Sequence, residues 1–299
     1  MAENKYAIGR ALAYIRRGMR IVILSDVHAN RVALEAVLAE VDALAPDQVV
    51  VAGDVINRGP EPRACLERLL GLREARHWQF IKGNHEDFVL LESRGELARA
   101  PWERLLYAHT HWTMNRVRDL LPRLAVWPDH FSLNGPDGSE VRFVHASMRG
   151  NRQGLYEDME EPVLAELTAP QPAVLVAGHT HIPFIRRING TMIVNAGAVG
   201  MPFDGITQPS FAVLEWNEGW SARIVRVTYD RAAAERAFVE SGYLDEGGPM
   251  VPLILDELRQ ARPRLGLWHR RYEVQVAAGQ LSLEDSVAHL LGEVGAACA

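Results

Sequence analysis

Cysteine is scarce in this chain of 299 residues, which contains only Cys65 and Cys298. The two residues are far apart in sequence and form neither a Cys-x-x-Cys pair nor a zinc-ribbon spacing. This spacing gives no sign of a thiolate metal site. A reducing, cytoplasmic location is the simplest expectation for such a protein.

The sequence also lacks a long hydrophobic run and an excess of positive charge. No apolar stretch approaches the roughly 20 residues that span a bilayer, and basic residues interrupt residues 1–18 throughout, unlike a secretory signal. The formal net charge of −6 gives no strong footprint for nucleic acid, although a local basic pocket for one phosphate stays open. We therefore expect neither a membrane nor a large nucleic acid as a partner.

The patterning divides the chain into three parts. Residues 1–18 carry a weak helical pattern and are expected to form an N-terminal extension, with Met19 as a candidate biological start. Residues 19–229 are expected to form the core. Residues 230–299 are expected to be a helical C-terminal appendage, with helices at 232–240, 251–261 and 283–294 and with Trp268 as a buried anchor.

The first half of the core predicts alternating strands and helices, which implies parallel strands with right-handed crossovers. The expected elements are strands at 21–24, 49–52 and 78–82 and helices at 30–44, capped by Asn30, and 61–74. Residues 86–121 read as helical and end at Pro122. The second half predicts hairpins and a second sheet packed on the first, from strands at 124–133 and 139–145, 185–188 and 192–194, and 210–216 and 222–229.

Polar side chains of the kind that bind metals follow five of the predicted strands. Asp54 comes directly after the buried run Val49–Val51, at the carboxyl end of a strand, where open α/β sheets build their sites. The other members of this set are Asp26, His28, Asn84, His85, His145, His179 and His181. Because residues i and i+2 of an extended segment project to the same side, Asp26 with His28 and His179 with His181 can each face one cavity. Oxygen and imidazole ligands without thiolate suit manganese, iron, zinc or nickel, and favour a pair of metals over one.

Another His-x-His pair, His109 and His111, lies in a predicted helix. Residues two apart on a helix point about 200° apart, so these imidazoles cannot meet at one metal centre. We expect them to be packing or surface residues.

Together these segments resemble the five-block signature of the calcineurin-like metallophosphoesterases, nearest to the small bacterial and archaeal phosphodiesterases. The matching blocks are Asp26-x-His28, Gly53-Asp54-x-x-Asn57-Arg58-Gly59, Gly83-Asn84-His85-Glu86, His145 and Gly178-His179-x-His181. Any one block is weak evidence, but all five in order are specific. The resemblance implies an α/β fold, a four-layer α/β/β/α sandwich of two mixed β-sheets flanked by helices.

The resemblance also implies a role for each matching residue. Asp54 would bridge two metals together with a water, with Asp26, His28 and His181 on the first metal and Asn84, His145 and His179 on the second. His85 would lie over the phosphate and either protonate the leaving oxygen or stabilise its charge. Arg58 would bind a phosphate oxygen, so Arg58, Asn84 and His85 form the expected substrate-binding set and Asp54 and His85 the catalytic one.

Three departures from known members limit the resemblance. The protein serine/threonine phosphatases have Asp where this chain has Asn57, and they lack the Gly-His-x-His block. Many small phosphodiesterases have no histidine at the position of His85. The segment 195–202 is similar to their Asn-Pro-Gly-Ser-Val-Gly loop but lacks its Pro and Ser, and we expect it to support the site through its glycines.

The expected function is hydrolysis of phosphodiesters, with cyclic nucleotides as candidates, by in-line attack of a metal-bridging hydroxide. The expected cofactors are two divalent metal ions, manganese first and iron, zinc or nickel as alternatives. The alternative hypothesis is a phosphomonoesterase that acts on nucleotides or phosphoprotein. A third and less favoured hypothesis is a non-catalytic binding scaffold. The partner is a small phosphoester, and a homo-oligomer stays open. The C-terminal helices are expected either to narrow the entrance to the site, or to cover an apolar face or form a dimer contact.

Overall fold

Alternate residues of the first two strands face two different cores, which is what a strand buried on both sides requires. In the computed structural model, which describes residues 18–297, these strands are β1 (Met19–Leu24) and β2 (Gln48–Val51). Ile21, Ile23 and Val50 pack between two sheets. The alternate residues of the same strands, Val22, Leu24, Val49 and Val51, pack under helices on the outer face. The expected helical pattern of residues 1–17 lies outside the described residues.

The first sheet has the strand order β10-β9-β1-β2-β3. Strands β1, β2 and β3 (Gln79–Phe80) are parallel, as predicted. Strand β9 (Ser210–Trp216) pairs antiparallel with β1, and β10 (Trp220–Arg226) pairs antiparallel with β9. We expected the antiparallel strands of the second half to build the second sheet, and for this hairpin the expectation is wrong. The β9–β10 hairpin extends the first sheet because β9 pairs with the edge of β1 that β2 leaves free.

The second sheet has the order β4-β5-β6-β8-β7, with parallel strands in the middle and antiparallel strands at both edges. Its strands are β4 (His130–Asn134), β5 (Glu140–Val144), β6 (Val174–Ala177), β7 (Phe184–Ile188) and β8 (Thr191–Asn195). Asn189 and Gly190 make the tight turn between β7 and β8, both with positive φ, as the sequence predicted. Both sheets are therefore mixed.

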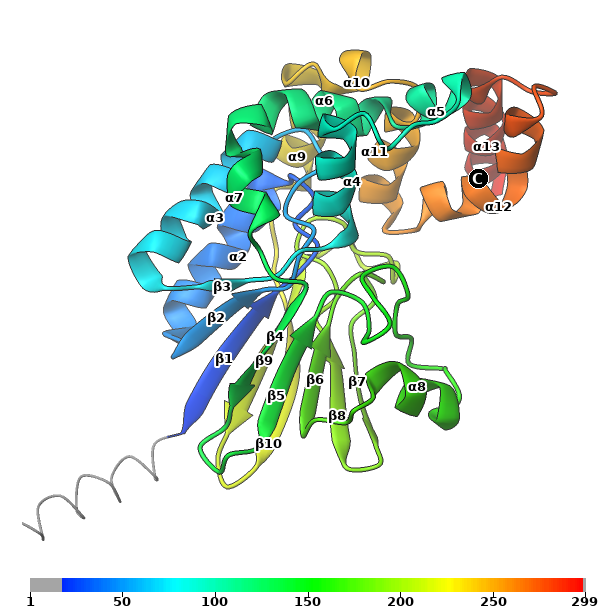
Figure 1. Cartoon of the computed structure of the whole chain (residues 1–299). Helices are drawn as coiled ribbons and strands as arrows, with labels where there is room; N and C mark the ends of the chain where they lie inside the picture. Colours follow the sequence, from blue (N-terminus) through cyan, green and yellow to red (C-terminus); the bar gives the residue numbers. More distant parts are fainter. Residues whose placement is uncertain (1–17, 298–299) are drawn as a thin grey trace, which may run out of the picture.

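Helices cover the outer faces of both sheets and complete four layers (Figure 1). Helices α2 (Arg31–Leu44) and α3 (Pro62–Arg76) pack on the first sheet, and α8 (Glu161–Thr168) packs on the second. The Asn30 side chain accepts a hydrogen bond from Ala33 N and caps α2, as expected. The predicted four-layer sandwich is confirmed.

The segment between the two sheets is broken into several helices. They are α4 (Asn84–Ser93), α5 (Pro101–Leu106), α6 (Ala108–Val117), a 3-10 turn (Arg118–Leu120) and α7 (Leu121–Ala125). Pro122 lies in the first turn of α7, where a missing N–H costs nothing. The expectations that the helical segment ends at Pro122 and that a strand begins at residue 124 are therefore wrong.

The C-terminal part is helical, as expected, and its helices lie along the side of the molecule where α4–α6 are found (Figure 1). They are α9 (Arg231–Glu240), α10 (Tyr243–Glu246), α11 (Val251–Gln260), α12 (Arg264–Ala277) and α13 (Leu283–Ala297). Neither α10 nor α12 was among the helices expected from the sequence pattern. Helix α12 buries only Trp268, Tyr272 and Val276, a stripe too narrow to stand out from its polar sequence.

These helices share buried clusters with the rest of the chain. Phe238, Tyr243 and Ile254 pack in one cluster with Trp112 and Phe203. The α12–α13 pair packs against α5 and α11 in another. The boundary between a core at 19–229 and an appendage at 230–299 remains a prediction, and so does the narrowing of the site entrance. Within residues 18–297, no helix combines the length and apolar character needed to cross a membrane.

Trp268 is the expected anchor, and it is fully buried with its indole N–H donating to Ser286 Oγ at 2.7 Å. We predict that Trp268→Ala lowers the free energy of unfolding by about 3–5 kcal/mol, measured by urea denaturation, because it leaves a large cavity. Val274→Ala on the same helix is the control, since Val274 is 82% exposed. Equal effects of the two substitutions would contradict the anchoring role.

Candidate metal centre

The loops that follow β1, β2, β3, β5 and β6 bring the predicted metal-binding residues together. Two groups of ligand atoms each lie within 4.8 Å of one another, and Asp54 belongs to both. The first group is Asp26, His28, Asp54 and His181, and the second is Asp54, His145 and His179. Asn84 adjoins the second group, with its Oδ1 3.1 Å from His145 Nε2 and 2.9 Å from His179 Nδ1.

Of the other histidines singled out in the sequence, His85 lies beside the two ligand groups, and His109 and His111 do not belong to them. The carboxylate Oδ1 of Asp54 accepts a hydrogen bond from His85 N at 2.9 Å, so His85 adjoins the cluster. His109 and His111 lie in α6 and belong to neither group of ligands. His109 is buried and His111 is exposed beside Glu92, as expected for packing and surface residues.

The backbone of these loops is strained. Five predicted ligands have a left-handed φ, which is uncommon for residues other than glycine and costs about 1–3 kcal/mol each. The values are 55° at Asp26, 45° at His28, 54° at Asp54, 66° at His179 and 60° at His181. We expected extended segments to turn residues i and i+2 to one side, and that reasoning is wrong. Tight turns bring these side chains together instead.

Backbone hydrogen bonds hold the first two loops side by side. Asp26 N donates to Gly53 O at 3.1 Å and His28 N donates to Asp54 O at 2.9 Å. The loop at 195–202 closes from the other side, since Gly200 N donates to Asp26 O at 2.9 Å. A Cβ at Gly200 would lie 1.8 Å from Val27 O, which confirms that a glycine permits the close approach expected there.

Glu86 fixes the loop that carries Asp54, a role that sequence reasoning missed. Its buried carboxylate accepts backbone hydrogen bonds from Gly83, Asp54 and Val55, each at 2.8 Å, and from Ile56 at 3.3 Å. Burial and the charge of Asp54 raise the pKa of Glu86 to about 7, against the effect of the backbone donors. The sequence feature that could have predicted this role is a glutamate at the third position of a helix, because a carboxylate there often accepts from free backbone N–H groups.

Each aspartate uses one oxygen for its own placement and presents the other to the histidines. Asp26 Oδ2 accepts from Ser25 Oγ at 2.6 Å and from His179 N at 2.9 Å. Asp26 Oδ1 has no hydrogen bond from the described part of the chain and lies 3.1 Å from His181 Nε2. Asp54 Oδ2 lies 3.2 Å from His145 Nε2 and 3.7 Å from His28 Nε2.

Two imidazole nitrogens, His28 Nε2 and His181 Nε2, face each other. His28 Nδ1 donates to Asn57 O at 3.2 Å and His181 Nδ1 donates to Met201 O at 2.5 Å. A carbonyl oxygen accepts only from a protonated nitrogen, so each ring carries a proton on Nδ1, and in its neutral form it presents its Nε2 lone pair. These two Nε2 atoms are 3.1 Å apart. Facing lone pairs repel, and a cation bound by both relieves the repulsion.

The ionised Asp54 carboxylate attracts positive charge to the centre. Burial would raise the pKa of Asp54, but His145, His85 and His28 hold it well below the usual value, so the carboxylate is ionised. Burial lowers the pKa of His145, but the Asp54 charge outweighs it and raises this pKa to about 10. Burial and the neighbouring His181 and His85 hold the pKa of His28 well below the usual value. The donor set therefore fits divalent metal ions.

The comparisons with known proteins agree with this geometry. The sequence model of the calcineurin-like phosphoesterase superfamily domain matches residues 19–219, so the chain belongs to this superfamily. It is a metal-dependent phosphoric ester hydrolase.

Three similar proteins illustrate the match. An uncharacterized protein of Methanocaldococcus jannaschii is 26% identical over 239 residues, which are 74% of this chain and 92% of that protein. The structure of a metallophosphoesterase from Sphaerobacter thermophilus is 27% identical, with a TM-score of 0.62, over 82% of this chain and all of that one. A hypothetical protein from Pyrococcus horikoshii shares the fold at 16% identity, with a TM-score of 0.69, over 81% of this chain and 98% of that one.

The Glu86 contacts lead to a test of how the centre is held. We predict that Glu86→Gln lowers the free energy of unfolding of the metal-free chain by about 1–3 kcal/mol, because an amide group turns a donor towards backbone donors. Urea denaturation above neutral pH, where Glu86 is ionised, gives the measurement. Glu92→Gln on the same helix is the control, since Glu92 pairs with the exposed His111. No loss for Glu86→Gln would contradict the placement role.

Proposed function

We propose that this protein hydrolyses phosphodiesters, with cyclic nucleotides as candidate substrates, at two divalent cations that share Asp54. Manganese is the first choice of metal, and iron, zinc or nickel also fit this donor set. The supporting observation is that two groups of ligand atoms meet at one ionised carboxylate. The first cation would be held by Asp26, His28, Asp54 and His181, and the second by Asp54, Asn84, His145 and His179.

Two such cations, when bound, lower the pKa of a water molecule and balance the charge of the phosphoryl oxygens. The residues of the chain keep this arrangement in place. Asp54 can serve both groups because His85 N holds its Oδ1 while Oδ2 faces the histidines. The backbone carbonyls that accept from His28, His145 and His181 keep the free nitrogen of each ring directed inward.

His85 is best placed as a neutral hydrogen-bond donor. Arg58 N donates to Asn57 Oδ1 at 3.0 Å, which fixes the orientation of this amide. Asn57 Nδ2 then donates to Thr110 Oγ1 and to His85 Nδ1, each at 3.0 Å. The proton of the neutral His85 ring is therefore on Nε2. Burial also keeps the pKa of His85 well below the usual value, although the Asp54 charge acts in the opposite direction.

This arrangement favours one of the two roles that the resemblance left open for His85. A neutral imidazole is a weak acid but a good donor, and it can stabilise the charge that develops on the leaving oxygen. A neutral imidazole in an enzyme site can polarise a substrate oxygen in this way. We therefore assign His85 to charge stabilisation.

A cavity beside the centre suits the leaving group of a diester. It has a volume of about 260 Å³ and is lined by His145 together with Asp87, Asp129, His130, Ser147 and Asn151. Asp87 and Asp129 in its wall share the ammonium group of Lys82, at 3.2 and 3.1 Å, and their remaining oxygens can accept from hydroxyl groups. This composition supports a substituent such as a sugar. A panel of monoesters and diesters assayed with manganese tests the choice, and faster turnover of monoesters would favour the alternative phosphomonoesterase function.

Asp54 gives the most direct mutational test of the shared carboxylate. We predict that Asp54→Asn abolishes turnover of a bis-aryl phosphodiester and lowers the metal content after dialysis, because a neutral amide attracts two cations poorly. Asp87→Asn is the control for metal content, since Asp87 lines the neighbouring cavity. An Asp54→Asn variant that keeps two metals per chain and nearly full activity would show that the site is misplaced. Wild-type protein without metal and without turnover would favour the scaffold interpretation.

His85 is expected to affect the chemical step more than metal binding. We predict that His85→Ala keeps the metals and slows kcat by about 10²–10³-fold, the usual effect of removing one donor to a developing charge. Metal analysis and steady-state kinetics with a poor leaving group provide the measurements. The exposed His111→Ala is the matched histidine control. An unchanged rate for His85→Ala would remove His85 from the mechanism.

A further inference from the structure

A carboxylate from the C-terminal helices reaches the predicted phosphate-binding arginine. Glu257 in α11 is fully buried, and its Oε2 pairs with Arg58 Nη2. The partners are 199 positions apart in sequence. Arg58 lies within the region that matches the superfamily, which ends at residue 219, and Glu257 lies beyond it.

The guanidinium of Arg58 is enclosed beside the metal centre. Its central carbon lies 5.4 Å from the ring centre of Phe203, and Phe203 stacks on His181 at 4.2 Å. The side chain is only 10% exposed. Arg58 Nε is buried and has no hydrogen-bond partner within the described residues. The Arg58 guanidinium therefore pairs with one carboxylate, and its remaining N–H groups can donate to another anion.

Glu257 is itself held in place by the start of the next helix. Its Oε1 accepts hydrogen bonds from Arg264 N at 2.7 Å and from Leu265 N at 2.9 Å. These donors are among the N–H groups that a helix leaves free at its first turn. One oxygen thus fixes the carboxylate on α12, and the other restrains a long, flexible side chain whose free rotation would otherwise oppose binding.

We propose that Glu257 is a positioning residue for Arg58, so that the C-terminal helices set how strongly the centre holds a phosphoryl group. Glu257 binds one terminal nitrogen of the guanidinium and leaves its other N–H donors for a phosphate oxygen. This role rests on the proposed function, since it takes Arg58 as the phosphate-binding residue. It gives the region beyond the superfamily match a part in substrate binding.

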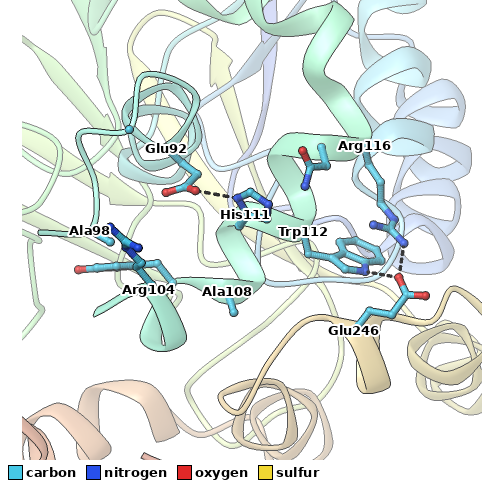
Figure 2. A pocket seen from close by; sticks show the side chains of 11 residues that line it. Glu92, Ala98, Arg104, Ala108, His111, Trp112, Arg116 and Glu246 are labelled. Carbon is cyan, nitrogen blue, oxygen red and sulfur yellow. Dashed lines mark hydrogen bonds and ion pairs between the residues drawn. The ribbon is translucent and has the colours of Figure 1, made fainter. Parts of the chain in front are cut away.

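A second ion pair joins similar parts of the chain and provides a matched control. Arg116 in α6 pairs with Glu246 in α10 at 2.9 Å, and Glu246 also accepts from the Trp112 indole (Figure 2). This pair lines an open cavity of about 670 Å³ that contains none of the predicted metal ligands. Glu246 is 62% exposed, and exposed pairs contribute little.

The experiment measures kcat and KM for a bis-aryl phosphodiester with manganese in a double-mutant cycle. The four proteins are wild type, Glu257→Gln, Arg58→Ala and the double variant. We expect Glu257→Gln to raise KM by about tenfold, the effect of one charged hydrogen bond, with a smaller change in kcat. In the Arg58→Ala background it should have no further effect, and Glu246→Gln should change neither constant.

The opposite pattern overturns the proposal. If Glu257→Gln raises KM equally with and without Arg58, or lowers kcat and metal content together, Glu257 acts only on the fold. If Glu257→Gln does not fold, Glu257→Asp keeps the charge but withdraws it by one methylene. A folded Glu257→Asp with unchanged KM would then contradict positioning, and a raised KM would support it.

A binding measurement separates this proposal from the proposed function. Wild-type protein that hydrolyses none of the tested esters contradicts the function. Calorimetry with inorganic phosphate and manganese-loaded protein tests the positioning without turnover. We expect about tenfold weaker phosphate binding for Glu257→Asp than for Glu246→Gln. Equal affinities would overturn the role of Glu257.

Discussion

Asp54 Oδ2 lies between His145 Nε2 at 3.2 Å and His28 Nε2 at 3.7 Å, and His28 Nε2 in turn faces His181 Nε2 at 3.1 Å. The ionised Asp54 carboxylate attracts positive charge, and the Nε2 acceptors of His28 and His181 repel each other when both rings are neutral, unless a cation lies between them. The strained loops and the Glu86 carboxylate keep these acceptors together despite that repulsion. The arrangement is understandable as a site prepared for cations before they bind.

The fold gives these loops a rigid support. Strands β1 and β2 are buried on both faces and end at the loops that carry Asp26 and Asp54. The second sheet brings His145 and the His179–His181 turn to the same place from its own strand ends. The C-terminal helices complete the wall around Arg58 through Glu257. Distant parts of the chain thus share one small group of charges.

Local patterns in the sequence could predict two packed sheets and the members of the candidate site, and the resemblance to the metallophosphoesterases implied the four layers. Apolar β-branched runs such as Val49–Val51 mark buried strands, and each polar block follows such a run. The sequence could not predict the partner of β9, which depends on a free sheet edge, or the helix α7 (Leu121–Ala125), which contains Pro122 in its first turn. The part played by Glu257 was also hidden, because its partner lies 199 positions away. The convergence of His179 and His181 was expected for the wrong reason, since it depends on turns with positive φ.

Anomalous diffraction from manganese-soaked crystals tests whether two cations share the Asp54 carboxylate. We expect two anomalous peaks flanking Asp54, one beside His28 and His181 and the other beside His145 and His179. A single peak, or peaks that do not contact Asp54, would contradict this expectation.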